Sequence, residues 1–356
     1  MTAQAAAGAA AQAVVDVVAL GESMVTFLPA RPGRLADVPS FDRGIGGAES
    51  NVACALAAAG HTARWVSRVG ADGFGDHLVE AVGRYGVDTS AVGRDPHRPT
   101  GIYFRTADDR DTDAHEVVYY RAGSAASAMS PSSVDEGALT AARILHLSGI
   151  TPALSADCLA LVRHLCTRRP DRGPLVSFDI NHRPRLWKDA GDGPGVLLDL
   201  ARGADLVFVG EDEAAAAWGV TGGPAAVRAA LPEPATLVVK QGSRGATVFR
   251  HGEDPVFRAA LHVDVVAPVG AGDAFAAGFL SATLRDLPAD RCLRHGHLMA
   301  AAALTVPGDL ATPPARTHAD RLADLDDAAW ETLRLGPGWT DLVPADTEAE
   351  EEVRTP

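Results

Sequence analysis

The second half of the chain alternates short apolar segments with helical ones, and this limits the fold more than any other feature. Apolar runs without polar alternation predict buried strands at 144–147, 175–180, 206–209 and 236–239. Helices are expected near 156–166 and from Glu211 onward. Strands that are apolar on both sides and separated by helices indicate a parallel sheet covered on both faces. The sequence therefore predicts an α/β fold, in which ligands bind beyond the carboxyl ends of the strands.

The first part of the chain adds elements that do not fit this alternation. Two tyrosine-bearing segments, 101–106 and 116–121, flank a charged loop at 107–115 and predict an antiparallel hairpin. A hairpin inserted into an α/β domain is a candidate lid over a binding site. The remaining expectations are strands at 14–20 and 63–69, an irregular or short-stranded stretch at 29–43, a turn at 70–75 and a helix at 76–84.

Charge and composition exclude several classes of function. The net charge of −14 over 356 residues argues against a nucleic acid or an anionic membrane as partner. An anionic substrate would therefore need a locally positive site. No apolar run reaches the length of a membrane span. The cysteines show no metal-binding spacing, and reduced thiols in a cytoplasmic protein are expected: Cys54, Cys158, Cys166 and Cys292.

A glycine-rich turn at Gly270-Ala271-Gly272-Asp273 runs directly into an apolar segment with helical spacing. A turn that opens a helix presents free N–H groups and the positive end of the helix dipole, which together favour an anion by up to about 2 kcal/mol. A carboxylate at such a place repels phosphate unless it takes a proton from a hydroxyl that attacks the phosphate. Asp273 is therefore either a general base or an ordinary helix N-cap.

A second glycine cluster lies at 44–51 and precedes an alanine-rich helix that stops at Gly60. It is not the dinucleotide-binding fingerprint, because Glu49 occupies the place of the third glycine. Either the backbone approaches a ligand here, with Asn51 facing the same place, or the segment is a plain turn. A P-loop is excluded, because the two lysines, Lys188 and Lys240, do not follow a glycine.

Both glycine clusters carry a resemblance. The Gly-Gly-Ala-x-x-Asn-Val-Ala motif at 46–53 and the Gly-Ala-Gly-Asp motif at 270–273 are similar to those of the ribokinase-like (PfkB) carbohydrate kinases, over roughly residues 14–315. Within that family the chain most resembles the 2-keto-3-deoxygluconate kinases, through the segments 100–104, 119–125 and 179–187. The resemblance implies a three-layer sandwich with a mostly parallel central sheet and a small β-sheet lid.

The resemblance also implies a reaction and a set of residues for it. ATP would phosphorylate the primary hydroxyl of 2-keto-3-deoxygluconate, with Asp273 as general base and the N–H groups of Gly270, Ala271 and Gly272 stabilising the transferred group. The sugar acid would be held by Gly46, Gly47, Asn51, Tyr103, Tyr119, Arg121, Arg183 and Asp309. The nucleotide would be held by Asn181, Arg183, Lys240, Gly242, Ser243, Gly245, Gly270 and Gly272. Mg²⁺ would be held by Glu213 or Glu211, directly or through water.

Two departures from the family pattern qualify these expectations. Gly210 stands where the acidic motif usually begins with Asn, which weakens the metal assignment. Ala267 stands where an Asp of the monovalent-cation site is common, which leaves potassium dependence open. Arg121 and Arg183 favour a sugar acid over a neutral sugar, because a guanidinium pairs bidentately with a carboxylate. The alternatives are another PfkB-family sugar kinase, acting on fructose, ribose or a nucleoside, or a catalytically silent sugar-binding protein of the same fold.

The expected domain organisation follows from the same patterns. We expect an N-terminal extension at 1–13, a kinase domain at 14–335 with lid strands near 22–45 and 100–121, and an acidic tail at 336–356. A homo-oligomer formed through the lid is a further expectation from the resemblance.

Overall fold

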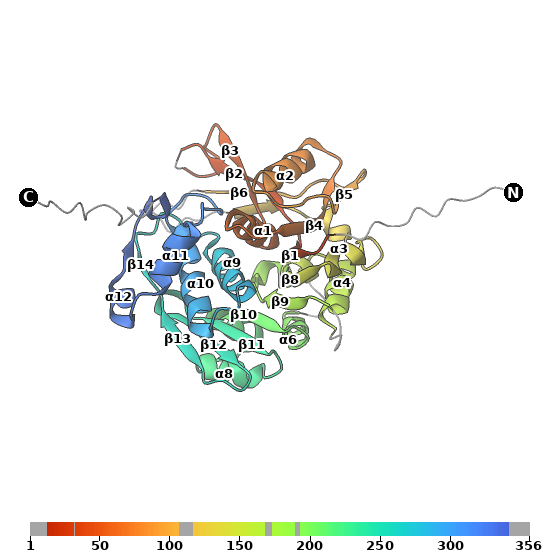
Figure 1. Ribbon diagram of the computed structural model, residues 1–356. Coiled ribbons are helices and arrows are strands. Elements are labelled where there is room, and N and C mark those ends of the chain that lie inside the picture. The colour runs from red at the N-terminus through yellow and green to blue at the C-terminus, as the bar shows by residue number, and fades with distance from the viewer. Residues whose placement is uncertain (1–12, 32, 107–116, 168–172, 189–192, 342–356) are drawn as a thin grey trace, which may run out of the picture.

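The computed structural model describes residues 13–31, 33–106, 117–167, 173–188 and 193–341. Its main feature is a nine-stranded sheet in the order β13-β12-β11-β10-β9-β8-β1-β4-β5 (Figure 1). From β11 to β5 each strand is parallel to its neighbours. The pairs β11/β12 and β12/β13 are antiparallel. The strands are β1 (Val15–Leu20), β4 (Ala63–Gly70), β5 (Val92–Asp95), β8 (Ala142–Ser148), β9 (Leu175–Asp179), β10 (Leu206–Gly210), β11 (Thr236–Lys240), β12 (Gly245–Arg250) and β13 (Val256–Ala259).

The sheet is buried on both faces, as the unbroken apolar strands predict. In β10, Leu206 and Phe208 belong to one hydrophobic core, and Val207 and Val209 belong to the other. Successive side chains of a strand point to opposite faces, so this split means that both faces of the sheet are covered. The strands predicted at 144–147, 175–180, 206–209 and 236–239 are all confirmed, and so is the α/β fold.

Helices cover the two faces in separate layers (Figure 1). One core joins the sheet to α1 (Ala48–Ala58), α9 (Ala271–Leu284) and α10 (Ala289–Leu304). The other joins it to α3 (Glu136–Thr140), α4 (Ala156–Cys166), α5 (Pro184–Trp187), α6 (Gly195–Arg202), α7 (Glu211–Trp218) and α8 (Pro224–Ala230). The remaining helices are α2 (Gly73–Arg84), α11 (Arg316–Ala323) and α12 (Asp327–Thr332), with single 3-10 turns η1 (Ala126–Ala128), η2 (Thr151–Ala153), η3 (Gly242–Arg244) and η4 (Trp339–Asp341).

A smaller four-stranded sheet lies beside α1 and α2, at the top of Figure 1. Its order is β3-β2-β6-β7, with β2 (Met24–Pro29), β3 (Phe41–Gly46), β6 (Ile102–Arg105) and β7 (Val117–Tyr120). The β2/β3 and β6/β7 pairs are antiparallel, and the β2/β6 pair is parallel. The predicted hairpin is therefore confirmed as β6 and β7, and its loop at 107–115 and Glu116 lie outside the described residues.

Two expected boundaries are wrong for local reasons. The helix expected at 76–84 begins at Gly73, because Asp72 caps it by accepting hydrogen bonds from the N–H groups of Phe74 and Gly75. The helix expected after the glycine cluster at 44–51 begins already at Ala48, and residues 44–46 complete β3, so the segment is not a plain turn. Asn51 consequently lies inside α1.

Packing continues beyond residue 335. A two-stranded ladder joins β14 (His262–Val263) to β15 (Arg334–Leu335), and the buried Trp339 lies 6.0 Å from the ring of His318. Residues 1–12 and 342–356, which make up most of the expected extension and tail, lie outside the described residues. Among the described helices, none has both the length and the apolar character that a membrane span requires.

Candidate active site

The glycine turn at 270–273 opens α9 beyond the carboxyl ends of the central strands. Gly270 is the N-cap of α9 and has a left-handed backbone with φ 77°. A side chain at Gly270 would also collide with the backbone carbonyl of Asp309. Only glycine suits both conditions. The first N–H groups of α9 therefore remain available for an anion, as at other helix N-termini.

Asp273 is the third residue of α9 and does not cap the helix, because the N-cap position belongs to Gly270. The N-cap interpretation of Asp273 is therefore wrong. Asn51 Nδ2, from α1, donates a hydrogen bond to Asp273 Oδ2 over 2.9 Å. The amide oxygen of Asn51 is buried and has no partner among the described residues. Two helices from opposite parts of the sequence thus fix the orientation of this carboxyl group.

The pKa of Asp273 is raised to about 7. Burial is the main cause, and the charges of Asp179 and Asp309 raise the pKa further. The hydrogen bond from Asn51 and the charge of Arg183 act in the opposite direction. A carboxyl group that titrates near neutral pH is a more effective proton acceptor than an ordinary aspartate.

Lys240, at the end of β11, lies close to the glycine turn and is surrounded by the carboxylates of Asp179 and Glu213. Its Nζ is 3.1 Å from both oxygens of Asp179 and 3.8 Å from Glu213 Oε2. Burial alone would lower the pKa of Lys240, but the charges of Asp179 and Glu213 raise it, so the ammonium group stays charged. A Cβ placed on Gly272 would lie 3.9 Å from Lys240 Nζ. The cation is therefore close to the N–H groups of the turn.

The small sheet meets the turn through Asp309. Tyr103 and Arg105 lie two residues apart on β6, so their side chains point to the same side of the strand. The Tyr103 hydroxyl donates to Asp309 Oδ2 over 3.2 Å, and Arg105 Nη2 donates to Asp309 Oδ1 over 2.9 Å. A side chain at Gly46 would meet both the Tyr103 hydroxyl and Asp309. Gly46, Tyr103 and Asp309 thus form one contiguous surface, as expected for a sugar site.

Tyr119 and Arg121 continue that surface. The rings of Tyr103 and Tyr119 are 5.3 Å apart, and the Arg121 guanidinium lies 5.9 Å from the centroid of Tyr119. Arg121 forms an ion pair with Glu22, which is 1% exposed in its side chain and also accepts a 2.5 Å hydrogen bond from Ser124 Oγ. The cation is therefore held in place by a buried carboxylate.

Gly47 lets the start of α1 lie against the segment that contains Glu22 and Ser23. It is the N-cap of α1, and a side chain there would meet the carbonyl of Glu22 and the Cα of Ser23. The segment that follows β1 and the segment that opens α1 can approach so closely only because Gly47 has no side chain.

Asn181 and Arg183, expected to contact the nucleotide, follow directly after β9. Asn181 has an unusual positive φ of 40°, and its side-chain oxygen is buried without a partner among the described residues. Such strained, partnerless polar groups are typical of binding sites. Arg183 is exposed and close enough to Asp273 to lower its pKa.

The other expected nucleotide residues form the predicted strand–turn–strand after Lys240. Gly242 and Ser243 lie in η3, and Gly245 opens β12, where a side chain would collide with the carbonyl of Arg258. Among the described contacts, none joins Gly242 or Ser243 to the glycine turn. Their place in a nucleotide site therefore stays a prediction.

Neither expected metal ligand is free in this arrangement. Glu213 accepts hydrogen bonds from the backbone N–H groups of Gly210 and His182, at 2.6 and 3.1 Å, and faces Lys240. Glu211 pairs with Arg244 and accepts from Gln241. Within the described residues, no group of three or more acidic, histidine or cysteine side chains could hold a metal ion. The arrangement fits contact through water better than direct coordination by either glutamate.

Sequence reasoning missed Arg105, Asp179 and Glu22. Arg105 could have been found from the alternation of β6, since it shares a face with Tyr103. Asp179 ends β9, at the edge where ligand-binding groups gather. Glu22 carries no such signal, because its role depends on Arg121, a residue 99 positions later in the chain.

Comparisons with known proteins agree with this geometry. The family model described as "pfkB family carbohydrate kinase" matches residues 15–316. A 2-dehydro-3-deoxygluconokinase from Bacillus subtilis is 36% identical over 305 residues, which cover 85% of this chain and 93% of the relative. Both the expected family and the closer resemblance within it are thus confirmed.

Solved structures agree as well. A 2-dehydro-3-deoxygluconokinase structure from Thermotoga maritima has a TM-score of 0.77 at 27% identity and covers 88% of this chain and 99% of its own. An Escherichia coli structure described as a putative ribokinase II in complex with ATP and Mg²⁺ shares the fold, with a TM-score of 0.76 at 24% identity and coverage of 86% and 98%. The chain belongs to the pfkB family of carbohydrate kinases.

Proposed function

We propose that this kinase transfers the γ-phosphoryl group of ATP to the primary hydroxyl of 2-keto-3-deoxygluconate and gives the 6-phosphate. This sugar acid is the 2-dehydro-3-deoxygluconate in the names of the Bacillus subtilis and Thermotoga maritima relatives. The observation that carries the proposal is Asp273, a carboxylate with a pKa raised to about 7 among the free N–H groups of a helix N-terminus.

Asp273 is the general base of the proposed reaction. Asn51 occupies Oδ2, which leaves Oδ1 to accept the proton of the substrate hydroxyl. The hydroxyl oxygen forms its bond to the γ-phosphorus as the bond between that phosphorus and the β,γ-bridging oxygen breaks. ADP leaves, and the proton stays on Asp273 until it is released to solvent.

The groups around the turn stabilise the negative charge that moves during transfer. The N–H groups of Gly270, Ala271 and Gly272 point toward the phosphoryl group, and Lys240 and Arg183 supply positive charge beside it. Loss of one donor of such a site typically lowers the rate by about 10²–10³. Mg²⁺, when bound, would neutralise phosphate charge, with Glu213 acting through water. The positions of Gly242, Ser243 and Gly245 support contacts to the nucleoside part.

The residues around the proposed sugar site support a sugar acid over a neutral sugar as the substrate. Arg121 and Arg183 supply guanidinium groups for the substrate carboxylate. Gly46, Gly47, Tyr103, Tyr119 and Asp309 supply the surface for its hydroxyl groups. A neutral sugar would forgo an ion pair with the exposed Arg183, whereas Arg121 would keep its pair with Glu22.

An ADP-release assay across acids and neutral sugars tests the substrate. We expect kcat/KM for 2-keto-3-deoxygluconate to exceed that for fructose and ribose by more than about tenfold, or 1.4 kcal/mol. A tenfold preference for either neutral sugar would favour the alternative kinases.

The base role has its own test. Asp273→Asn should keep nucleotide binding and lose most turnover, and near-normal turnover would contradict this role. Full nucleotide binding without turnover in the wild-type protein would favour the silent binding protein.

Two further proposals concern the cellular location and the oligomeric state of the enzyme. A cytoplasmic location is supported by the four free, buried cysteines, as in proteins of reducing compartments. A homo-oligomer through the small sheet is supported by Tyr119 and Tyr120 on β7, which are 46% and 62% exposed. Size-exclusion chromatography with light scattering tests the second proposal.

A further inference from the structure

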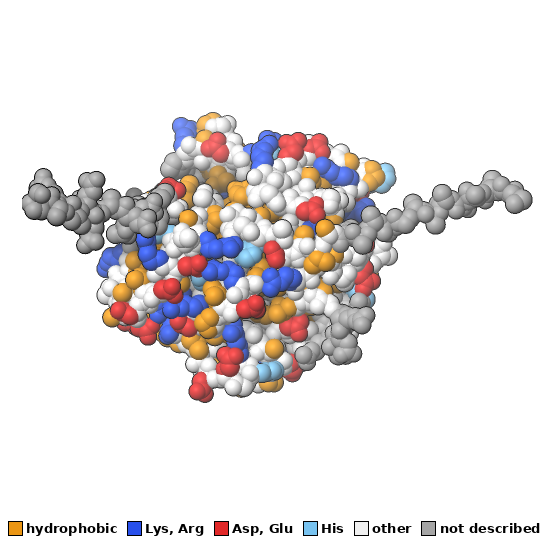
Figure 2. All heavy atoms as spheres, viewed as in Figure 1, with side chains coloured by type: hydrophobic (Ala, Val, Ile, Leu, Met, Phe, Trp, Pro, Cys, Tyr) orange, Lys and Arg blue, Asp and Glu red, His pale blue; other side chains and the backbone are white. Residues whose placement is uncertain are grey.

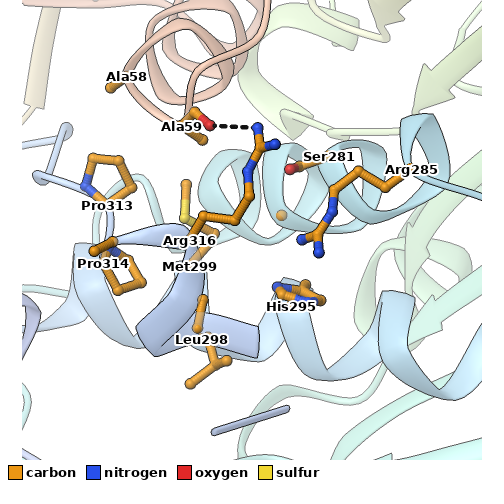
Figure 3. Close-up of a pocket in the computed structure, with 13 residues that line it drawn as sticks. Ala58, Ala59, Ser281, Arg285, His295, Leu298, Met299, Pro313, Pro314 and Arg316 are labelled. Carbon is orange, nitrogen blue, oxygen red and sulfur yellow. Dashed lines mark hydrogen bonds between the residues drawn. The ribbon is translucent and has the colours of Figure 1, made fainter. Parts of the chain in front are cut away.

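A pocket of about 130 Å³ lies away from the catalytic turn, at the other ends of α1 and α9 (Figure 3). Its wall includes Ala59 after the end of α1, Ser281 and Arg285 near the end of α9, and His295 on α10. Arg316, the first residue of α11, closes it on the remaining side. The pocket therefore joins four helices, two of which carry Asn51 and Asp273 at their opposite ends.

Two guanidinium groups face this pocket. Arg316 Nη2 donates a 3.2 Å hydrogen bond to the Ala59 carbonyl, and in the described part of the chain no carboxylate lies within 4.0 Å of Arg316 (Figure 3). Arg285 Nη2 is 2.8 Å from both oxygens of Asp320. Arg316 is exposed and has no carboxylate partner among the described residues, whereas Arg285 is paired with one acid.

The pKa values of the two neighbouring histidines are lowered mainly by burial, and charges of both signs act on them. Burial lowers the pKa of His61; Asp16 acts in the opposite direction, but the charges of Arg316 and Arg285 lower the pKa further. His61 is joined to the pocket through a 2.8 Å hydrogen bond to Ser281 Oγ. Burial also lowers the pKa of His295 to about 4, so this ring is neutral at physiological pH. Figure 2 shows basic side chains side by side with acidic ones over α9 and α11 on this face.

The size and walls of the pocket limit what can bind. One water needs roughly 10–15 Å³ by the same measure, so 130 Å³ has room for a ligand of about ten non-hydrogen atoms. Leu298, Met299, Pro313 and Pro314 make the other wall apolar. The free donors of Arg316 and the Ser281 hydroxyl suit an oxyanion at one end.

We propose that this pocket is an effector site for a small oxyanion, a carboxylate or a phosphate, and that its occupancy is coupled to phosphoryl transfer. Ala59, directly after α1, is eight residues from Asn51, and Ser281 is eight residues from Asp273 on α9, so the pocket is about 12 Å from the Asn51–Asp273 hydrogen bond along both helices. Val52 and Leu56 of α1 and Phe279 of α9 share one hydrophobic core. An anion that draws Arg316 toward Ser281 therefore acts on two helices that together hold the proposed base. The coupling, though not the binding, rests on the proposed function.

Binding is measured first, without any reaction. Inorganic phosphate and acetate are titrated calorimetrically into the full chain saturated with Mg²⁺ and a non-hydrolysable ATP analogue, which occupies the nucleotide site. We expect one site per chain that saturates below about 10 mM for at least one of the two anions. Arg316→Gln should weaken this binding by at least about tenfold, because it removes a charge-assisted hydrogen bond. Arg84→Gln, on the exposed surface of α2, is the matched control and should leave binding unchanged.

A second variant tests whether Arg316→Gln weakens binding through the loss of charge or through a change in folding. Ala58→Glu adds a negative charge at the exposed rim of the pocket and should also weaken anion binding at unchanged melting temperature. Absence of saturable binding, or equal binding by wild type, Arg316→Gln and Ala58→Glu, would overturn the site.

Kinetics then test the coupling. At a saturating concentration of the bound anion, kcat/KM for the sugar should change at least twofold in wild type and Arg84→Gln but not in Arg316→Gln. Inhibition by phosphate at the nucleotide site would affect all three equally and is thereby distinguished. Binding with no difference in kinetics would overturn the coupling, whichever sugar proves to be the substrate.

Discussion

Replacement of Asp273 by asparagine should stabilise the unliganded protein at alkaline pH. The pKa of this carboxyl group is about 7 in the folded protein, against an ordinary 3.8, mainly because it is buried. Between these two values the folded state binds more protons than the unfolded state, so the stability of the wild type falls as pH rises. Asparagine is uncharged at every pH, as the protonated carboxyl group is, so the variant should not lose this stability as pH rises.

The magnitude follows from the size of the shift. About three pKa units correspond to about 4 kcal/mol above pH 8, and the partial exposure of Asp273 reduces this to about 2–4 kcal/mol. For 356 residues the unfolding entropy near the midpoint is about 0.75 kcal/mol/K, so the melting temperature should rise by about 3–5 °C. Near pH 5 less than half of this difference should remain, because the wild-type carboxyl group is then largely protonated.

Differential scanning calorimetry of both proteins, without ligands, at pH 5 and pH 8.5 measures the effect. Asp254→Asn, in an exposed turn, is the control and should shift the melting temperature by less than about 1 °C at either pH. A difference that is equal at the two pH values, or an asparagine variant less stable than wild type at pH 8.5, would refute the account of Asp273 as a buried, destabilised carboxylate.

Two further predictions concern catalysis and the small sheet. The kcat/KM of the wild type should rise with pH, reach half its maximum near pH 7 and level off above about pH 8, because Asp273 must be ionised to accept a proton; a steady-state profile that is flat from pH 5 to 9 would contradict this. Arg105→Met should lower the stability by about 3–5 kcal/mol, since it leaves Asp309 without its cation, and should raise KM for the sugar more than for ATP. Urea unfolding and initial-rate kinetics measure both effects, and an increase confined to the KM for ATP would speak against a place in the acceptor site.

The large elements could be predicted because each follows from a local pattern. The parallel strands are continuous apolar runs, and the start of α9 is marked by Gly270, whose φ of 77° few other residues tolerate. Helix boundaries were less predictable, since Asp72 caps α2 through a side-chain contact that apolar periodicity does not report.

The contacts inside the site were harder to foresee, because they join residues that are far apart in the sequence. The Asn51–Asp273 bond spans 222 positions and the Tyr103–Asp309 bond spans 206. Motif resemblance named most of these residues without giving their partners. It also did not reveal that Glu213 caps its own helix and meets Lys240, which favours a contact to Mg²⁺ through water over direct coordination.

The position of Asp309 has a consequence for how the kinase handles ATP before an acceptor arrives. Its backbone carbonyl lies against Gly270 of the phosphate-binding turn, and its side chain is held by Tyr103 and Arg105 of the small sheet. A shift of that sheet on sugar binding therefore reaches the turn through Asp309. We expect the turn to adopt its working shape only once a sugar has filled the acceptor side, so that water is a poor substitute for the alcohol and ATP is hydrolysed slowly in its absence.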